Sequence, residues 1–173
     1  MTVAASRESA EAVASAEPHR PRLRAYARSI LHDADAAEDA VQDALCRLLD
    51  ASNIPAEPAA LRAWLFTAVR NRCIDVLRKE KRMTALAELD GSVPAPPASN
   101  PAQRIEAADD ARHALAALDA LPTLQRDALR LRFSGGLSYK QIAAAMDKSV
   151  SHVGVLIHEG LATLRQQLNP NAS

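Results

Sequence analysis

Charged side chains are separated into two segments of opposite sign. Residues 33–50 hold six acids and one base, a net charge of −5, and residues 62–82 hold seven bases and two acids, a net charge of +5. An acidic surface suits a basic protein partner and a basic surface suits nucleic acid, although either segment can instead be a solvated helix face. The net charge of the whole chain is zero, whereas a self-sufficient DNA-binding domain is usually basic.

The C-terminal part of the chain has the pattern of a helix-turn-helix. Ser138 and Gln141 stand at the spacing of a capping box, Asp147 and Lys148 interrupt the helical pattern, and Ser149 can cap a second helix. The expected buried stripe of that second helix is Val153, Ile157, Leu161, Leu164 and Leu168. In a helix-turn-helix, the first residues of the second helix enter a DNA major groove. Periodicity alone fits any other helical hairpin equally well.

Composition predicts an all-α protein with two small helical domains. Aromatic residues make up only 3% of the chain and there are five glycines, which favours helices packed through Leu, Ala and Val. No apolar run approaches the roughly 20 residues that span a bilayer, so we expect no membrane insertion and a cytoplasmic protein. Cys46 and Cys73 lack metal-ligand spacing. We therefore expect both to be reduced core residues, with no metal or other cofactor.

The sequence predicts the order of the segments that hold the charged residues in place. We expect residues 1–17 to be a mobile tail, with a frayed helix as the alternative, and residues 18–82 to form the first domain. Its helices should run from Pro21 to about Leu31, from a capping box of Asp35 and Glu38, and over about 59–82. The third helix should bury Leu61, Leu65, Val69, Cys73, Val76 and Leu77. A Pro-rich linker should occupy residues 83–103, and residues 104–169 should form the second domain.

Two long motifs resemble one known family. DADAAEDAVQDALCRLL, followed by LRAWLFTAVRNRCIDVLRKEKR, resembles region 2 of the extracytoplasmic-function (ECF) group of sigma-70 family transcription initiation factors. ALDALP, then Gln125 and Arg126, then GLSYKQIA and the Ser-x-x-His-Val that follows, resembles region 4 of the same group. The family commonly has Phe at the position of Leu45 and often Trp at that of Leu49. Both departures keep the position apolar.

The resemblance implies a promoter-specificity subunit and its partners: core RNA polymerase through the beta-prime clamp and beta subunits, promoter DNA, and an anti-sigma factor. The implied polymerase-binding residues are Glu38, Asp39, Gln42, Asp43 and Arg47. Those implied to bind the −10 element are Ser52, Asn53, Arg70, Asn71, Asp75 and Arg78. Those expected to bind the −35 element are Arg126, Arg130, Lys140, Lys148, Ser149, Ser151, His152 and Val155. His158 and Glu159 are expected to face solvent, and Arg130 and Arg132 can alternatively pair with Asp127.

The second helix of the helix-turn-helix departs from the family pattern. No Lys or Arg stands between Lys148 and Arg165, so region 4 should hold DNA weakly by itself. Gly154 and Gly160 should each cost the helix about 1 kcal/mol relative to Ala.

Two other function classes are open at this point. One is a sigma-like adaptor that binds an anti-sigma or regulatory partner without directing transcription. The other is an enzyme with a metal held by His32, Asp35, Asp39 and Asp43. The enzyme is disfavoured because helical carboxylate sites draw their ligands from several facing helices, and these residues lie together in one short segment.

Overall fold

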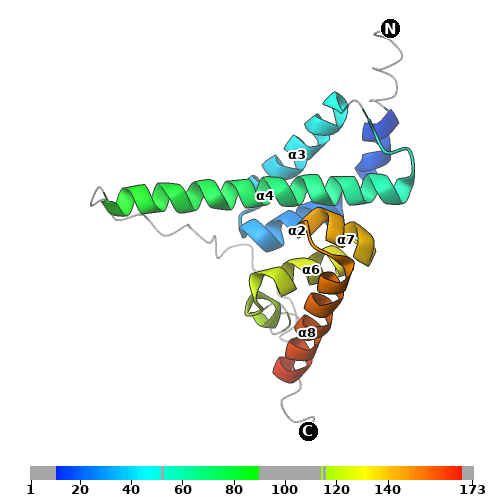
Figure 1. The fold of residues 1–173 in the computed structure, drawn as a ribbon. Coiled ribbons are helices and arrows are strands. Elements are labelled where there is room, and N and C mark those ends of the chain that lie inside the picture. The colour runs from blue at the N-terminus through cyan, green and yellow to red at the C-terminus, as the bar shows by residue number, and fades with distance from the viewer. Residues whose placement is uncertain (1–10, 52, 90–113, 115, 169–173) are drawn as a thin grey trace. The chain divides into compact units, whose positions relative to one another are not determined.

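The computed structural model describes residues 11–51, 53–89, 114 and 116–168, and all regular structure in that part of the chain is helical (Figure 1). The chain divides into two compact units, Met1–Asn100 and Pro101–Ser173. The predicted all-α fold with two helical domains is therefore confirmed. None of the described helices combines the length and apolar composition that crossing a membrane requires.

The first unit is built on α2 (Arg20–Leu31), α3 (Ala34–Asp50) and α4 (Pro58–Leu89), each of which packs against the other two. Their shared core is made of side chains removed from solvent: Leu23, Tyr26, Val41, Leu48, Leu65, Phe66 and Val69. The rings of Tyr26 and Phe66 meet edge to face, with centroids 5.3 Å apart. This aromatic pair joins α2 to α4.

The turn between α2 and α3 differs from the expected one. Asp33, not Asp35, caps α3 by accepting a hydrogen bond from the Ala36 N–H at 2.8 Å. His32 before it adopts a left-handed conformation, with φ 55°, which ends α2. Glu38 takes no part in a capping box, because its carboxylate is paired with arginines of α2.

Helix α4 is longer than expected and is buried along less of its length. It continues through Leu89 rather than ending near Arg82, so residues 83–89 are helical and not part of a linker. Those residues are mostly good helix formers, without Gly or Pro. The last fully buried position is Cys73, whereas Leu77, expected in the buried stripe, is 40% exposed. The remaining linker residues, 90–103, lie outside the described part of the chain.

Two further expectations for the first unit need correction, and in the first case the alternative of a helix replaces the mobile tail over the described residues. Residues 11–16 are helical, and η1 (Glu17–His19) joins them to α2. Ala12 and Ala16 are buried, so the part of the expected tail that the structure describes is packed against the unit. Cys46 is exposed, because the core-facing positions of α3 are taken by Val41, Leu45 and Leu48; Cys73 is buried as expected, and both are free thiols.

The second unit is built on α6 (Thr123–Phe133), α7 (Tyr139–Met146) and α8 (Val150–Leu168), which pack against one another. The predicted capping box is present: the Gln141 N–H donates to Ser138 Oγ at 3.2 Å, and the Ser138 N–H donates to Gln141 Oε1 at 2.9 Å. Asp147, with φ 54°, ends α7. The Ser149 hydroxyl accepts from the His152 N–H at 3.1 Å and caps α8 as predicted.

Helix α8 buries a different set of residues from the predicted stripe. Val153 and Ile157 are buried as expected, but Leu156 and Gly160 are the other buried positions, and Leu168 is 43% exposed. Gly160 lies against α6, where a Cβ would stand 2.8 Å from Leu129 Cδ1 and 3.4 Å from Gln125 Cβ. The absent side chain therefore lets α6 and α8 approach closely, which offsets the helix-propensity cost expected of this glycine.

Candidate functional site

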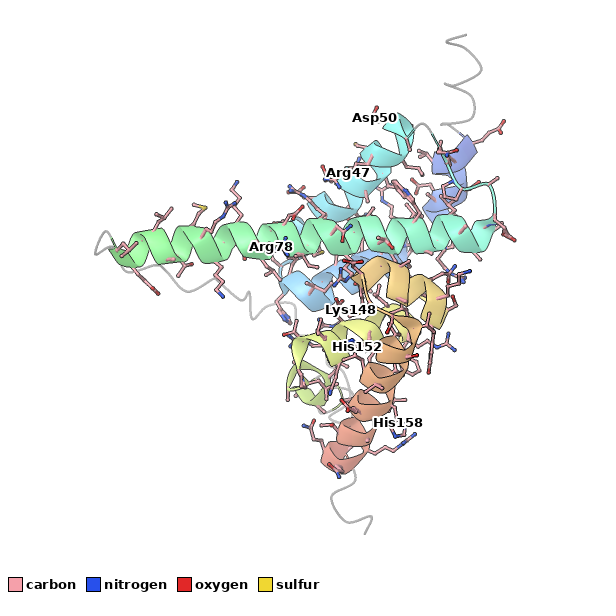
Figure 2. All side chains as sticks on the ribbon, in the orientation of Figure 1. Arg47, Asp50, Arg78, Lys148, His152 and His158 are labelled. Carbon is pink, nitrogen blue, oxygen red and sulfur yellow. The ribbon has the colours of Figure 1, made fainter. Side chains whose placement is uncertain are left out.

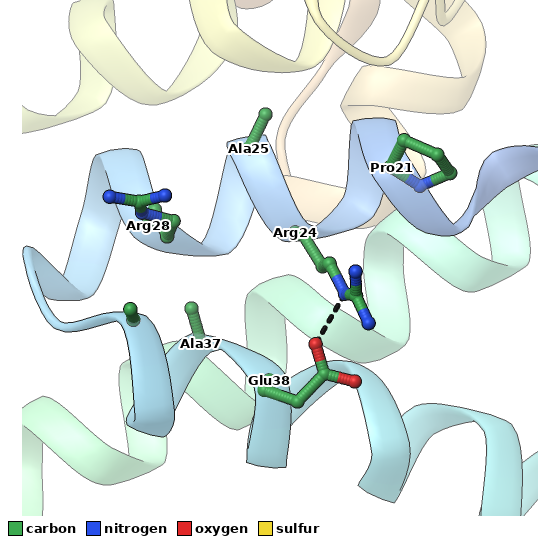
Figure 3. A pocket seen from close by; sticks show the side chains of 7 residues that line it. Pro21, Arg24, Ala25, Arg28, Ala37 and Glu38 are labelled. Carbon is green, nitrogen blue, oxygen red and sulfur yellow. Dashed lines mark ion pairs between the residues drawn. The ribbon is translucent and has the colours of Figure 1, made fainter. Parts of the chain in front are cut away.

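The polar face of α3 is partly engaged by α2. An ion pair joins Arg24 to Glu38 (Figure 3). Arg20 Nη2 lies 3.4 Å from Glu38 Oε1 and donates to Gln42 Oε1 at 2.6 Å. The hydrogen bond from Arg24, with the charges of Arg24 and Arg20, lowers the pKa of the Glu38 carboxyl. The sequence pattern did not reveal these contacts, because they join residues far apart in the chain.

Asp43 connects α3 to α4. Its Oδ2 lies 3.4 Å from Arg47 Nε on the same helix and 3.5 Å from Arg72 Nε on α4. Asp39, Gln42 and Arg47 are exposed. Asp39 forms no ion pair in the part of the chain that the structure describes, so its carboxylate is available to a basic partner. The five predicted polymerase-binding residues thus share one helix, but only some of them are free of intramolecular ion pairs.

A pocket of about 430 Å³ lies between α2 and α3 beside this face (Figure 3). Small apolar side chains and the Arg24–Glu38 pair line it: Pro21, Arg24, Ala25, Arg28, Ala34, Ala37 and Glu38. It is a wide, open depression with no deeply buried polar group. Such a depression lacks the enclosed form of a small-molecule site.

Helix α4, which contains the basic segment 62–82, carries a polar stripe. Asn71, Asp75 and Arg78 are exposed and recur at helical spacing, and Arg78 is labelled on α4 in Figure 2. Arg70 is half-buried beside them, and Asn53 is exposed in the segment before α4. Ser52, the other predicted loop contact, lies outside the described residues. The stripe offers amide and guanidinium donors of the kind that contact phosphates and base edges.

The outward face of α8 carries most of the predicted reading residues of the second unit. Ser151, Val155 and His158 recur at steps of four and three and are all exposed, so they form one stripe, and His152 is exposed beside it (Figure 2). His158 was not among the predicted reading residues, although its spacing from Val155 could have identified it. Lys140 and Lys148 are exposed on and just after α7. Polar and apolar groups thus face outward where a major groove would lie.

Arg130 was expected to contact DNA, but its guanidinium is buried and paired. It is only 7% exposed, and its Nη2 donates to Asp119 Oδ1 at 2.8 Å. Arg126 Nη1 donates to the Asp119 carbonyl oxygen at 2.7 Å and keeps part of its surface exposed. Asp119 stands before the turn at Pro122, so helical spacing could not reveal it as the partner of either arginine. Arg130 is therefore largely withdrawn from solvent, whereas Arg126 keeps part of its side chain exposed, and its predicted contact with DNA stays a prediction.

Arg132 and Tyr139 form a second pairing that sequence patterns did not reveal. Arg132 Nη1 donates to the Leu137 carbonyl oxygen at 2.8 Å, and its guanidinium lies 5.5 Å from the centre of the Tyr139 ring. Across the described residues, His, Cys, Asp and Glu side chains form no group of three or more that could hold a metal ion.

Comparison with known proteins identifies both units. The family model for sigma-70 region 2 matches residues 16–83, and the model for sigma-70 region 4 matches residues 112–164. The chain is 40% identical over 126 residues to the ECF RNA polymerase sigma factor EcfG of Rhodopseudomonas palustris, covering 72% of this chain and 66% of that protein. It is 24% identical over 151 residues to ECF RNA polymerase sigma factor SigK of Mycolicibacterium vanbaalenii, covering 86% of this chain and 77% of that protein.

Two solved structures are also similar. The sigma factor RpoE in complex with the anti-sigma factor NepR from Bartonella quintana has a TM-score of 0.66 and 30% identity, covering 87% of this chain and 92% of that chain. CnrH in complex with the cytosolic domain of CnrY has a TM-score of 0.62 at 24% identity, covering 97% of this chain and 99% of that chain, and supports the fold alone. Region 2 and region 4 occur here in the family's order, on the two units that carry the acidic, basic and helix-turn-helix surfaces. The chain belongs to the extracytoplasmic-function group of the sigma-70 family.

Proposed function

We propose that this protein is a promoter-specificity subunit that binds core RNA polymerase and directs transcription initiation through −10 and −35 contacts. The observation that carries this proposal is the match of both sigma-70 regions, in order, to two helical units. Binding to polymerase places the protein in the cytoplasm. It holds DNA and polymerase together and carries out no covalent chemistry itself.

Polymerase docking is assigned to the polar face of α3. Asp39 is exposed and carries no ion pair within the described chain, so it is the acid most able to meet a basic surface of the beta-prime clamp. Gln42 and Glu38 are held in place by Arg20 and Arg24, which lowers the ordering cost of a contact there. Asp43 and Arg47 complete the face.

The −10 element is assigned to α4 and the segment before it. Asn71 and Arg78 are exposed on a helix whose opposite face is buried, so their donors can reach DNA without disturbing the core. Asn71 can make two hydrogen bonds to one adenine edge, and Arg70 and Arg78 suit phosphates or guanine. Asp75 lies between them, and Ser52 and Asn53 remain candidates for an unstacked base.

The −35 element is assigned to α7 and α8. Ser149, Ser151, His152 and Val155 stand at the start of α8, the part of a recognition helix that enters the major groove. Lys140, Lys148 and Arg126 supply positive charge for phosphates. An anti-sigma factor is a further proposed partner, since the similar RpoE structure is a complex with one.

Reconstitution with core polymerase tests the docking assignment. Asp39→Lys should abolish competition for core polymerase without unfolding the protein, because the side chain is exposed and unpaired. Glu11→Lys makes the same change of charge on an exposed residue that is not part of α3 and should bind normally. If Asp39→Lys competes as well as the unaltered protein, the docking face is wrong.

Promoter selection by the holoenzyme tests the DNA assignments. Asn71→Ala should relax base preference in the −10 element alone, and His152→Ala in the −35 element alone, each by about 1–3 kcal/mol at one base. A holoenzyme that binds core polymerase but selects and transcribes no promoter would favour the adaptor alternative. That alternative draws support from the absence of Lys and Arg between Lys148 and Arg165.

A further inference from the structure

The outward face of α8 contains one apolar side chain at the position where the helix should meet DNA. Val150, the first residue of α8, is 48% exposed, and Val155 is 51% exposed in the middle of the stripe that Ser151 and His158 share. Val155 projects from the face of α8 opposite the buried Val153 and Ile157, whereas Val150 stands three residues before Val153 and seven before Ile157, at the edge of the buried face. An exposed valine keeps apolar surface in water, so a contact that covers that surface is favoured.

The same helix lacks the side chains that most often identify bases. Arg or Lys pairs with guanine and Asn or Gln pairs with adenine, but residues 150–165 contain no Lys, Asn or Gln, and their one arginine, Arg165, lies at the far end. Glu159, which could accept from cytosine, is engaged by the Gln125 amide at 3.0 Å. The groups left to face the groove are hydroxyl, imidazole and valine methyl groups.

We propose that Val155 recognises the 5-methyl group of thymine in the −35 element. This inference rests on the proposed function and specifies its chemistry. Thymine alone among the four bases presents a methyl group in the major groove, and an apolar side chain is its complement. Ser151 and His152 beside Val155 supply the hydrogen bonds that fix the register. Region 4 then obtains specificity by apolar contact, without Lys or Arg in the part of α8 that enters the groove.

Deoxyuridine provides the direct test, because it pairs as thymine does but lacks the methyl group. Promoters are first selected by holoenzyme from a library randomised in the −35 element, and each selected thymine is then replaced by deoxyuridine, singly, on either strand. At one or two positions the replacement should weaken holoenzyme binding about fourfold, the effect of covering one methyl-sized group. Deoxyuridine in the spacer serves as the DNA control.

Protein variants assign the effect to Val155. Val155→Ala should weaken binding to the thymine promoter by a similar factor and should remove the further loss on deoxyuridine substitution. Gln166→Ala, at an exposed position near the end of the same helix, should leave both affinities and the methyl dependence unchanged. The melting temperature of each variant verifies folding, since neither side chain is buried.

The outcomes separate this inference from the proposed function. Selected −35 elements without thymine, or equal binding to thymine and deoxyuridine promoters by an active holoenzyme, would overturn the methyl contact while leaving the sigma activity intact. A methyl dependence that persists in full in Val155→Ala would also overturn it. Absence of any selected promoter would overturn the proposed function itself.

Discussion

Replacing Gly160 and Gly154 by alanine, one at a time, should shift the stability of the second unit in opposite directions. Both glycines lie inside α8, so each gains about 1 kcal/mol of helix propensity as alanine. At Gly154 the nearest atom to the new Cβ is Tyr139 Cε2 at 3.9 Å, an ordinary contact, so the gain is kept. At Gly160 the new Cβ stands 2.8 Å from Leu129 Cδ1, and Leu129 is only 2% exposed.

The difference between the two variants isolates the packing cost. Overpacking a buried contact costs about 1–3 kcal/mol, and the propensity gain cancels in the subtraction. Gly154→Ala should therefore be more stable than Gly160→Ala by about 1–3 kcal/mol, with the unaltered protein between them or near the lower value. Leu129 cannot simply rotate away, since Gln125 Cβ and Leu129 Cγ also lie 3.4 Å from the new atom.

Hydrogen exchange of amides in α6 and α8 measures this difference in the second unit alone, because the first unit has its own core and can unfold separately. Denaturation followed by circular dichroism gives a second value for the whole chain. If the unfolding free energies of the two variants differ by less than about 0.5 kcal/mol, a Cβ at position 160 fits between α6 and α8, and the packing cost assigned to it is wrong.

Three other predictions follow from contacts described above. Asp119→Ala should lower the unfolding free energy of the second unit by about 1–3 kcal/mol, since it leaves the buried Arg130 guanidinium without this acceptor, and Asp119→Asn should lose less; urea denaturation measures both. The lowered pKa of Glu38 means that its ion pairs stabilise the folded state fully above the ordinary glutamate pKa, and that this contribution is lost as pH falls through the lowered value. The stability gap between the unaltered protein and Glu38→Gln, less than about 1 kcal/mol because the carboxylate is partly exposed, should close on acidification; equal gaps at neutral and acid pH would contradict this. The free chain, with zero net charge, should bind duplex DNA more weakly than about 1 µM at physiological salt, as fluorescence anisotropy would show, whereas the holoenzyme binds promoters.

Features that depend on neighbours within one helical turn were predictable from sequence. The caps at Ser138 and Ser149 and the break at Asp147 were confirmed, because each depends on residues no more than four positions away. The exposure of Asn71, Arg78, His152 and Val155 followed from the helical period of the buried residues around them. These local signals located most of the candidate site.

Features set by packing between helices were not predictable. The Arg130–Asp119 pair and the contact of Gly160 with Leu129 both require knowing how helices separated by turns approach one another. The Glu38 capping box was wrong because two arginines of α2 compete for the same carboxylate. The predicted buried stripe of α4 was longer than the observed one, which ends at Cys73. Periodicity shows which face of a helix is apolar but not where the neighbouring helices end.

The C-terminal end of α4 extends past the last buried residue of the helix and could unwind to lengthen the chain. Beyond Cys73 the helix has no fully buried side chain, and each helical residue contributes about 1.5 Å of rise where an extended one reaches about 3.4 Å. Unwinding residues 83–89 would lengthen the chain by about 13 Å and expose no core, since Met83, Leu86 and Leu89 are already exposed. The span from the polar stripe of Asn71, Asp75 and Arg78 to the end of α4 can therefore grow without a cost in buried area.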